Sequence, residues 1–117
     1  MVRKKILICD DELGVRESLN LILEDSYDLD FSSSGKDAAE KIRNGRYDGL
    51  LLDIKMPEKD GLETLEEIRQ IDPDIKVIIV TGYQSVETAS KAIQLGAMDY
   101  ITKPFESEEV KEKVSRI

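Results

Sequence analysis

Side chains that bind metal ions and phosphate stand directly after several short apolar runs of this chain. Asp10 and Asp11 follow the first run, Asp53 follows another, and Thr81 and Lys103 end two more. Carboxylates bind hard cations such as Mg²⁺, and a hydroxyl and an ammonium both bind phosphoryl oxygens. If the runs are neighbouring parallel strands, their carboxyl ends form one crevice and these side chains meet there.

Three carboxylates in one crevice repel one another, and without compensation at least one pKa would rise at a cost in stability. A divalent cation removes this repulsion, and Mg²⁺ prefers octahedral coordination by carboxylates, carbonyls, water and a phosphoryl oxygen. One carboxylate can also attack phosphorus to form an acyl phosphate, while Lys103 stabilises the charge on the transferring group. Thr81 would donate its hydroxyl to a phosphoryl oxygen. The residue types therefore favour Mg²⁺-dependent phosphoryl transfer.

The apolar runs predict the strands that must position these side chains. Residues 4–9, 49–53 and 77–80 are nearly continuous in large apolar side chains, which is typical of strands buried on both faces of a parallel sheet. Residues 27–31 alternate between apolar and polar and predict a strand near the sheet edge. A short last strand is expected at residues 100–102.

Helices are expected between the strands, because there the apolar residues recur with a helical period. Ser34 with Asp37, and Asp60 with Glu63, have the spacing of capping boxes. The expected helices cover about 13–25, 35–44, 61 toward Pro73, a segment from Ser85 to Gly96, and a segment from Ser107 to the last residue. The fourth of them has an apolar face made of Val86, Ala89, Ala92 and Ile93.

Five repeats of strand followed by helix predict an α/β fold with right-handed crossovers and helices on both faces of a mostly parallel sheet. The most polar strand, residues 27–31, belongs at an edge, which fits the flavodoxin-like order 2-1-3-4-5. We therefore expect a (βα)5 doubly wound sandwich, with a parallel five-stranded sheet, as one domain over residues 1–117. In this order the winding reverses between the strands that end at Asp10 and Asp53.

Composition argues against several other functions. Acids outnumber bases by 25 to 17, and a surface with a net charge of −8 repels nucleic-acid backbones. With no histidine and one cysteine, Cys9, the chain lacks catalytic triads and an ordinary zinc site. Cys9 is expected to be a buried thiol in a reducing compartment. No apolar run reaches about 18 residues and no signal peptide is recognisable, so we expect a cytoplasmic domain that does not bind membranes.

Together these motifs resemble the receiver domains of bacterial two-component response regulators over essentially the whole chain. The matching motifs are Asp10-Asp11, Leu51-Leu52-Asp53-Ile54-Lys55-Met56-Pro57, Asp60-Gly61, Thr81-Gly82 and Asp99-Tyr100-Ile101-Thr102-Lys103-Pro104-Phe105. The resemblance implies that Asp53 accepts a phosphoryl group from a sensor histidine kinase or a histidine phosphotransfer protein. It also implies a phosphoacceptor rather than an enzyme, with at most slow self-dephosphorylation.

The same resemblance assigns the metal ligands. It implies that Asp11 and Asp53 bind Mg²⁺ directly, that Mn²⁺ can substitute, and that Asp10 binds mostly through water. The backbone carbonyl of Lys55 is implied as the remaining ligand from the protein. The bond between Lys103 and Pro104 is implied to be cis, a state that is common only before proline.

A phosphoryl dianion on Asp53 would draw Thr81 and Lys103 inward and shift a pre-existing equilibrium. The resemblance implies that the ring of Tyr100, at the family's switch position, then fills the space that Thr81 leaves. The surface that changes would consist of the helix from Ser85, the strand at Tyr100 and the last helix. We expect this surface to bind partners and to be the interface of a homodimer.

Several alternatives share these residues. Residues 81–89, 91–97 and 99–100 are similar to receivers of nitrogen-regulation-type enhancer-binding activators. A stand-alone phosphorelay intermediate or the receiver of a hybrid kinase is also compatible with the sequence. A haloacid dehalogenase-like phosphatase also uses a strand-end aspartate, yet it needs an acid two residues later, where this chain has Lys55. A purely structural receiver that docks a partner without being phosphorylated is disfavoured by the complete set of acids.

Overall fold

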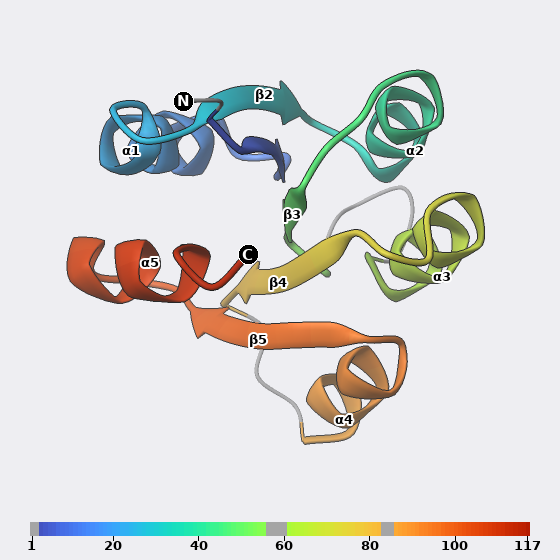
Figure 1. The fold of residues 1–117 in the computed structure, drawn as a ribbon. Coiled ribbons are helices and arrows are strands. Elements are labelled where there is room, and N and C mark those ends of the chain that lie inside the picture. The colour runs from blue at the N-terminus through green and yellow to red at the C-terminus, as the bar shows by residue number, and fades with distance from the viewer. Residues whose placement is uncertain (1–2, 56–60, 83–85) are drawn as a thin grey trace.

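The computed structural model describes residues 3–55, 61–82 and 86–117. Expectations for Met56, Pro57, Asp60 and Ser85 therefore lie outside the described residues. Strands and helices alternate along the described chain (Figure 1): β1 Lys5–Cys9, α1 Leu13–Leu23, β2 Asp28–Ser32, α2 Gly35–Asn44, β3 Gly49–Leu52, α3 Gly61–Ile71, β4 Lys76–Thr81, α4 Val86–Gln94, β5 Ala97–Thr102 and α5 Ser107–Val114.

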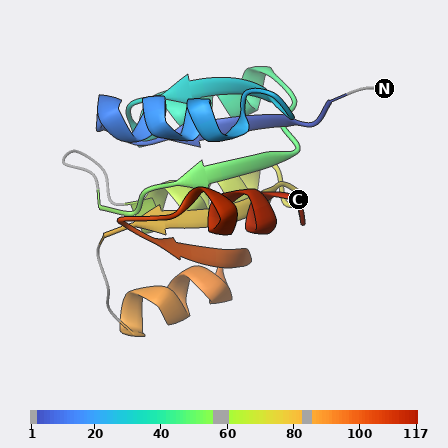
Figure 2. The same cartoon turned by 90° about the vertical axis from the view of Figure 1, so that its left-hand side faces the viewer.

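The strands form one parallel sheet in the order β2-β1-β3-β4-β5, which confirms the predicted topology. Figure 2 shows the strands pointing the same way, with the polar strand β2 at one edge as expected. Cys9 at the end of β1 pairs with Leu52 at the end of β3. The residues that follow these two strands therefore lie side by side at the carboxyl end of the sheet.

Each face of the sheet carries its own hydrophobic cluster, because successive strand residues point to opposite faces. Leu7 and Leu50 belong to the cluster to which α2, α3 and α4 contribute, whereas Ile8 and Leu51 belong to the cluster to which α1 and α5 contribute. Figure 1 shows these two groups of helices on opposite sides of the sheet. Burial on both faces explains why β1, β3 and β4 are nearly continuous apolar runs in the sequence.

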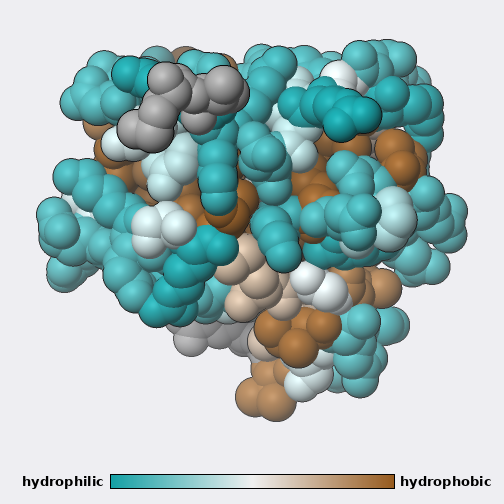
Figure 3. All heavy atoms as spheres, in the orientation of Figure 1, coloured by the Kyte–Doolittle hydropathy of each residue, from teal (hydrophilic) through white to brown (hydrophobic). Residues whose placement is uncertain are grey.

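The structure corrects three predicted elements. α5 ends at Val114 and not at the last residue. β5 begins at Ala97, three residues earlier than expected. Two of the four residues in the predicted apolar face of α4 are in solvent: Val86 is 86% exposed and Ile93 is 55% exposed, while Ala89 is half-buried and Ala92 is buried. The sheet ends at β5, so the outer part of α4 has no apolar layer beneath it. Figure 3 shows hydrophobic atoms at the surface over this helix.

The helices α2 and α3 meet where Gly35 lies against Thr64. Ser34 caps α2 as predicted, with its Oγ accepting the Asp37 N–H at 3.1 Å. A Cβ on Gly35 would overlap Thr64 Oγ1, a buried atom without a hydrogen-bond partner among the described residues. Only glycine therefore fits at the first position of α2 in this packing.

We expect Gly35→Ala to lower the free energy of unfolding by roughly 1–3 kcal/mol, because the new methyl overpacks the contact with Thr64. In a Thr64→Ala background the overlapping oxygen is absent, so the same change should cost less. Denaturant unfolding of both single variants and the double variant measures this coupling. Equal costs in the two backgrounds would show that the contact with Thr64 is not the source.

Candidate functional site

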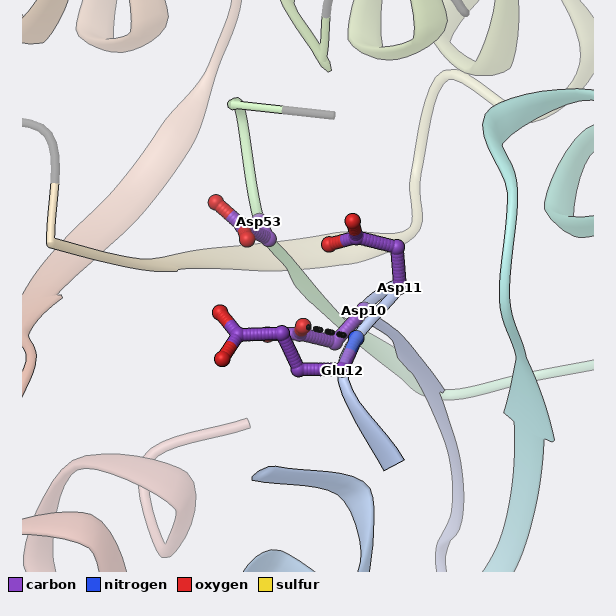
Figure 4. A group of neighbouring side chains, drawn as sticks. All are labelled: Asp10, Asp11, Glu12 and Asp53. Atoms are coloured by element: carbon purple, nitrogen blue, oxygen red, sulfur yellow. Dashed lines mark hydrogen bonds between the residues drawn. The ribbon is translucent and has the colours of Figure 1, made fainter. Parts of the chain in front are cut away.

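The ends of β1 and β3 bring four carboxylates together. Asp10, Asp11, Glu12 and Asp53 each place a carboxylate oxygen within 4.8 Å of the others (Figure 4). Asp10 and Asp53 are buried, at 2% and 3% exposure, whereas Asp11 and Glu12 are exposed. The predicted cluster of acids at these strand ends is therefore present, with two buried and two exposed carboxylates.

Lys103 directly follows the edge strand β5 and places its ammonium among these acids. Its Nζ lies 2.7 Å from Asp10 Oδ2, 3.1 Å from Asp53 Oδ2 and 3.5 Å from Glu12 Oε1. Its backbone N–H donates to the Thr81 carbonyl at 3.0 Å, which ties it to the end of β4. The peptide bond between Lys103 and Pro104 is cis, as the resemblance to receiver domains implied.

Burial and nearby charges have opposite effects on the pKa values of Asp10 and Lys103. Burial raises the pKa of Asp10, and the hydrogen bond and charge of Lys103 only partly offset it. Burial alone would lower the pKa of Lys103, but its bonds and attraction to Asp10 and Asp53 raise that pKa. Lys103 therefore keeps its proton and remains a cation inside the cluster.

Backbone groups fix the orientation of both buried carboxylates. Asp53 Oδ1 accepts the Lys55 N–H at 3.0 Å, and Asp10 Oδ1 accepts the Glu12 N–H at 2.9 Å. The start of α3 lies directly against the chain after Asp53, with the Gly61 N–H donating to the Ile54 carbonyl at 2.9 Å. These bonds leave the other oxygen of each carboxylate facing Lys103.

The other predicted site residues lie in β4, in β5 and after β3. Thr81 is buried at the end of β4, the strand beside β3. Tyr100 is half-buried in β5, where it pairs with Ile79, and its carbonyl accepts a hydrogen bond from Lys113. Lys55 is exposed and contacts Asp53 through its N–H. The metal contact predicted for the Lys55 carbonyl stays a prediction.

Sequence reasoning missed Glu12 as a member of the site. Its carboxylate belongs to the cluster and lies 3.5 Å from Lys103 Nζ. The available signal was its position directly after Asp10 and Asp11, at the same strand end. An acid just before a helix is equally consistent with an ordinary solvent-exposed side chain, so its position alone did not assign it to a site.

Comparison with known proteins decides the family. The family described as the response regulator receiver domain matches residues 6–115. This chain belongs to that family. Its predicted membership is thereby confirmed, and so is its function as a receiver domain of two-component response regulators.

This receiver is similar to transcription regulators and to a phosphotransferase. It is 40% identical over 102 residues to the transcriptional regulatory protein ZraR of Escherichia coli K12, covering 86% of this chain and 23% of ZraR. It is 35% identical to sporulation initiation phosphotransferase F of Bacillus subtilis, covering 99% of this chain and 94% of that protein. The chain thus spans less than a quarter of ZraR and nearly all of the phosphotransferase.

A solved receiver has the same fold. The CheY-like receiver domain protein of Methanospirillum hungatei superposes with a TM-score of 0.94 at 34% identity, covering 98% of this chain and 93% of that one. The flavodoxin-like fold expected from the sequence is therefore confirmed. Among the described helices of this receiver, none has the length and apolarity needed to cross a bilayer.

The donor set of the receiver fits Mg²⁺. All four clustered side chains offer carboxylate oxygens, which suit a hard cation, and Lys103 alone offsets only part of their charge. Cys9, the nearby soft ligand, is buried, and burial raises the pKa of its thiol to about 12. A thiolate is therefore absent near neutral pH, and the site favours oxygen-binding cations.

We expect Mg²⁺ to stabilise the receiver, because it binds the folded cluster and relieves its repulsion. At a free concentration 100 times its dissociation constant, the gain is about 2.7 kcal/mol, which raises Tm by several degrees. Thermal unfolding with and without Mg²⁺ checks this, and Asp11→Asn is expected to lose most of the shift. An equal shift from K⁺ at the same ionic strength would indicate general screening instead of a site.

Proposed function

We propose that this receiver accepts a phosphoryl group on Asp53, from a sensor histidine kinase or a histidine phosphotransfer protein, in a Mg²⁺-dependent reaction. The observation that carries the proposal is the position of Asp53, buried at the base of the acidic cluster with Lys103 3.1 Å from its Oδ2. The similarity to a phosphotransferase of Bacillus subtilis supports it.

In the proposed reaction Asp53 is the nucleophile. A carboxylate oxygen of Asp53 forms a bond to phosphorus as the bond between phosphorus and the donor's imidazole nitrogen breaks. The Lys103 ammonium, already 3.1 Å from Asp53 Oδ2, stabilises the negative charge on the transferring group. The hydroxyl of Thr81 donates to a phosphoryl oxygen.

Asp11 and Asp53 would hold Mg²⁺ directly, with Asp10 acting mostly through water and the Lys55 carbonyl completing the protein ligands; Mn²⁺ would substitute. When bound, the cation supplies positive charge that neutralises the phosphoryl oxygens. Glu12, at the exposed rim, adds negative charge that attracts the cation to the site.

The proposed switch uses Thr81, Lys103 and Tyr100. A phosphoryl group on Asp53 competes with Asp10 for Lys103 and attracts Thr81, and the ring of Tyr100 moves into the space that Thr81 leaves. The surface formed by α4, β5 and α5 then changes and controls an output domain or partner. It is also the surface proposed for a homodimer, and its exposed Val86 and Ile93 suit such a contact.

The proposed receiver is one domain over residues 1–117, is located in the cytoplasm with its kinase, and does not bind nucleic acid itself. It is a phosphoacceptor and not an enzyme that turns over, because Lys55 stands where a phosphatase of this chemistry needs its second acid. A stand-alone relay protein is the second candidate, because the Bacillus subtilis relative, 35% identical over 117 residues, is named a phosphotransferase. Reading the open reading frame beyond Ile117 distinguishes it from a receiver with an output domain.

Incubation with Mg²⁺ and a small acyl phosphate tests the proposed function. We expect one phosphoryl group per chain in the intact mass spectrum, located at Asp53 by borohydride reduction and peptide mapping, and none when EDTA is present. Labelling that stops at one equivalent also separates a receiver from a phosphatase, which would hydrolyse a generic phosphate ester repeatedly. No label under these conditions, or a label at another residue, would reject the proposal.

A further inference from the structure

Every polar atom of Asp10 has a partner in the structure. Its backbone N–H donates to the Ser32 carbonyl at 3.0 Å, and its two carboxylate oxygens accept from the Glu12 N–H at 2.9 Å and from Lys103 Nζ at 2.7 Å. Its backbone carbonyl accepts from Arg16 Nη1 at 2.6 Å. The fourth of these contacts comes from a residue outside the site described so far.

The carbonyl of Asp10 depends on a side chain because it lies beyond the end of β1. The strand pairs end at Cys9, so the sheet offers this carbonyl no further ladder partner. Arg16 lies in the first turns of α1, half-buried, and its own N–H donates to the Glu12 carbonyl at 3.2 Å. A bond from a guanidinium is charge-assisted and stronger than one from a neutral donor.

The direction of this carbonyl sets the position of Asp11. The Asp10 carbonyl and the Asp11 N–H belong to one planar peptide group, so a rotation of that group moves the start of Asp11 with it. Asp11 is exposed, and α1 begins only at Leu13. Arg16 therefore holds the peptide that joins the buried carboxylate of Asp10 to the exposed one of Asp11.

Arg16 also brings a positive charge next to the cluster, through its bond to the backbone carbonyl of Asp10. Counted together, the four carboxylates with Lys103 and Arg16 have a net charge of −2. One divalent cation neutralises this charge. Removing Arg16 makes the site more negative, and by charge alone a more negative site binds a cation more tightly. Without Arg16, a less well-fixed peptide between Asp10 and Asp11 would weaken Mg²⁺ binding, whereas the lost positive charge would strengthen it.

We propose that Arg16 is a positioning residue for the divalent cation: it fixes the peptide between Asp10 and Asp11 so that both carboxylates face the bound ion. This inference rests on the proposed function, because it requires that the cluster binds Mg²⁺. Groups that orient metal ligands without touching the metal contribute about 10–100-fold to affinity.

Isothermal titration of Mg²⁺ into the 117-residue chain, without a phosphoryl donor, tests the proposal. We expect Arg16→Met to weaken Mg²⁺ binding about tenfold or more, although it removes a positive charge. Arg16→Lys keeps the charge and one donor, so its affinity should lie between those of Arg16→Met and wild type. Arg43→Met is the matched control, because Arg43 makes the same charge change on α2, where it pairs with Glu67; its affinity should stay at the wild-type value or rise slightly.

The outcomes separate this proposal from the proposed function. If wild type binds no Mg²⁺, the metal-dependent function fails. If wild type binds and Arg16→Met binds as tightly or more tightly, the positioning role is overturned, because only charge was lost. A cooperative unfolding transition, measured in EDTA, establishes that each variant is folded before Mg²⁺ is added. If Arg16→Met does not fold, Arg16→Lys decides: weaker binding than wild type supports the proposal, and equal or tighter binding overturns it.

Discussion

Asp53→Asn is expected to abolish labelling by a small acyl phosphate, from one phosphoryl group per chain to background. The amide has the size of the carboxylate and can still accept the Lys55 N–H, which is 3.0 Å from Asp53 Oδ1 in wild type. Its oxygen carries no charge and does not attack phosphorus as a carboxylate does. Lys103 keeps its contact with Asp10 at 2.7 Å, so the variant should fold and lose the acceptor alone.

Intact mass spectrometry of wild type and Asp53→Asn, with Mg²⁺ and the same donor, measures this loss. Asp25→Asn is the matched control, because it makes the same chemical change at an exposed acid in the turn between α1 and β2 and should be labelled like wild type. Thermal unfolding establishes that both variants are folded. Full labelling of Asp53→Asn would assign the nucleophile to another carboxylate of the cluster, and peptide mapping would identify it.

Gly61→Ala is expected to destabilise the receiver by about 3 kcal/mol or more and to slow labelling of Asp53. A Cβ on Gly61 would overlap Ile54 Cα and would lie 2.7 Å from the Asp53 carbonyl oxygen and 2.9 Å from the Ile54 carbonyl carbon. All three atoms belong to the backbone, so no rotation of a side chain can relieve the clash. Either α3 or the chain after β3 must move, and the second of these carries the nucleophile.

Denaturant unfolding and the rate of labelling check the two effects of Gly61→Ala separately. Gly14→Ala is the control for an alanine in place of a helical glycine, because a Cβ there meets no atom within 4 Å apart from its chain neighbours and the nearby backbone of its own helix. We expect Gly14→Ala to stabilise the chain by roughly 0.5–1 kcal/mol, since it lowers the entropy cost of forming α1. A Gly61→Ala variant as stable as Gly14→Ala would contradict the tight contact at Ile54.

The strands and helices were predictable because their signals are local. Continuous apolar runs in β1, β3 and β4 reflect burial on both faces, and the alternating pattern of β2 reflects its place at the edge. α4 is the exception, because a helix with an apolar face is normally packed on a core. Its sequence could not reveal that the sheet ends at β5 and leaves Val86 and Ile93 in solvent.

From the sequence alone it followed that Asp10, Asp11 and Asp53 stand at strand ends, and the strand order brings those ends together whatever the loops do. Only the tertiary structure decided which atoms meet: that Lys103 contacts Asp10, Asp53 and Glu12, and that Arg16 holds the Asp10 carbonyl. These contacts join residues up to 93 positions apart in the sequence. They depend on sheet twist, strand register and side-chain rotamers. A local pattern of residue types does not determine those distances. An acidic cluster can therefore be predicted from this sequence, but the contacts that balance its charge cannot.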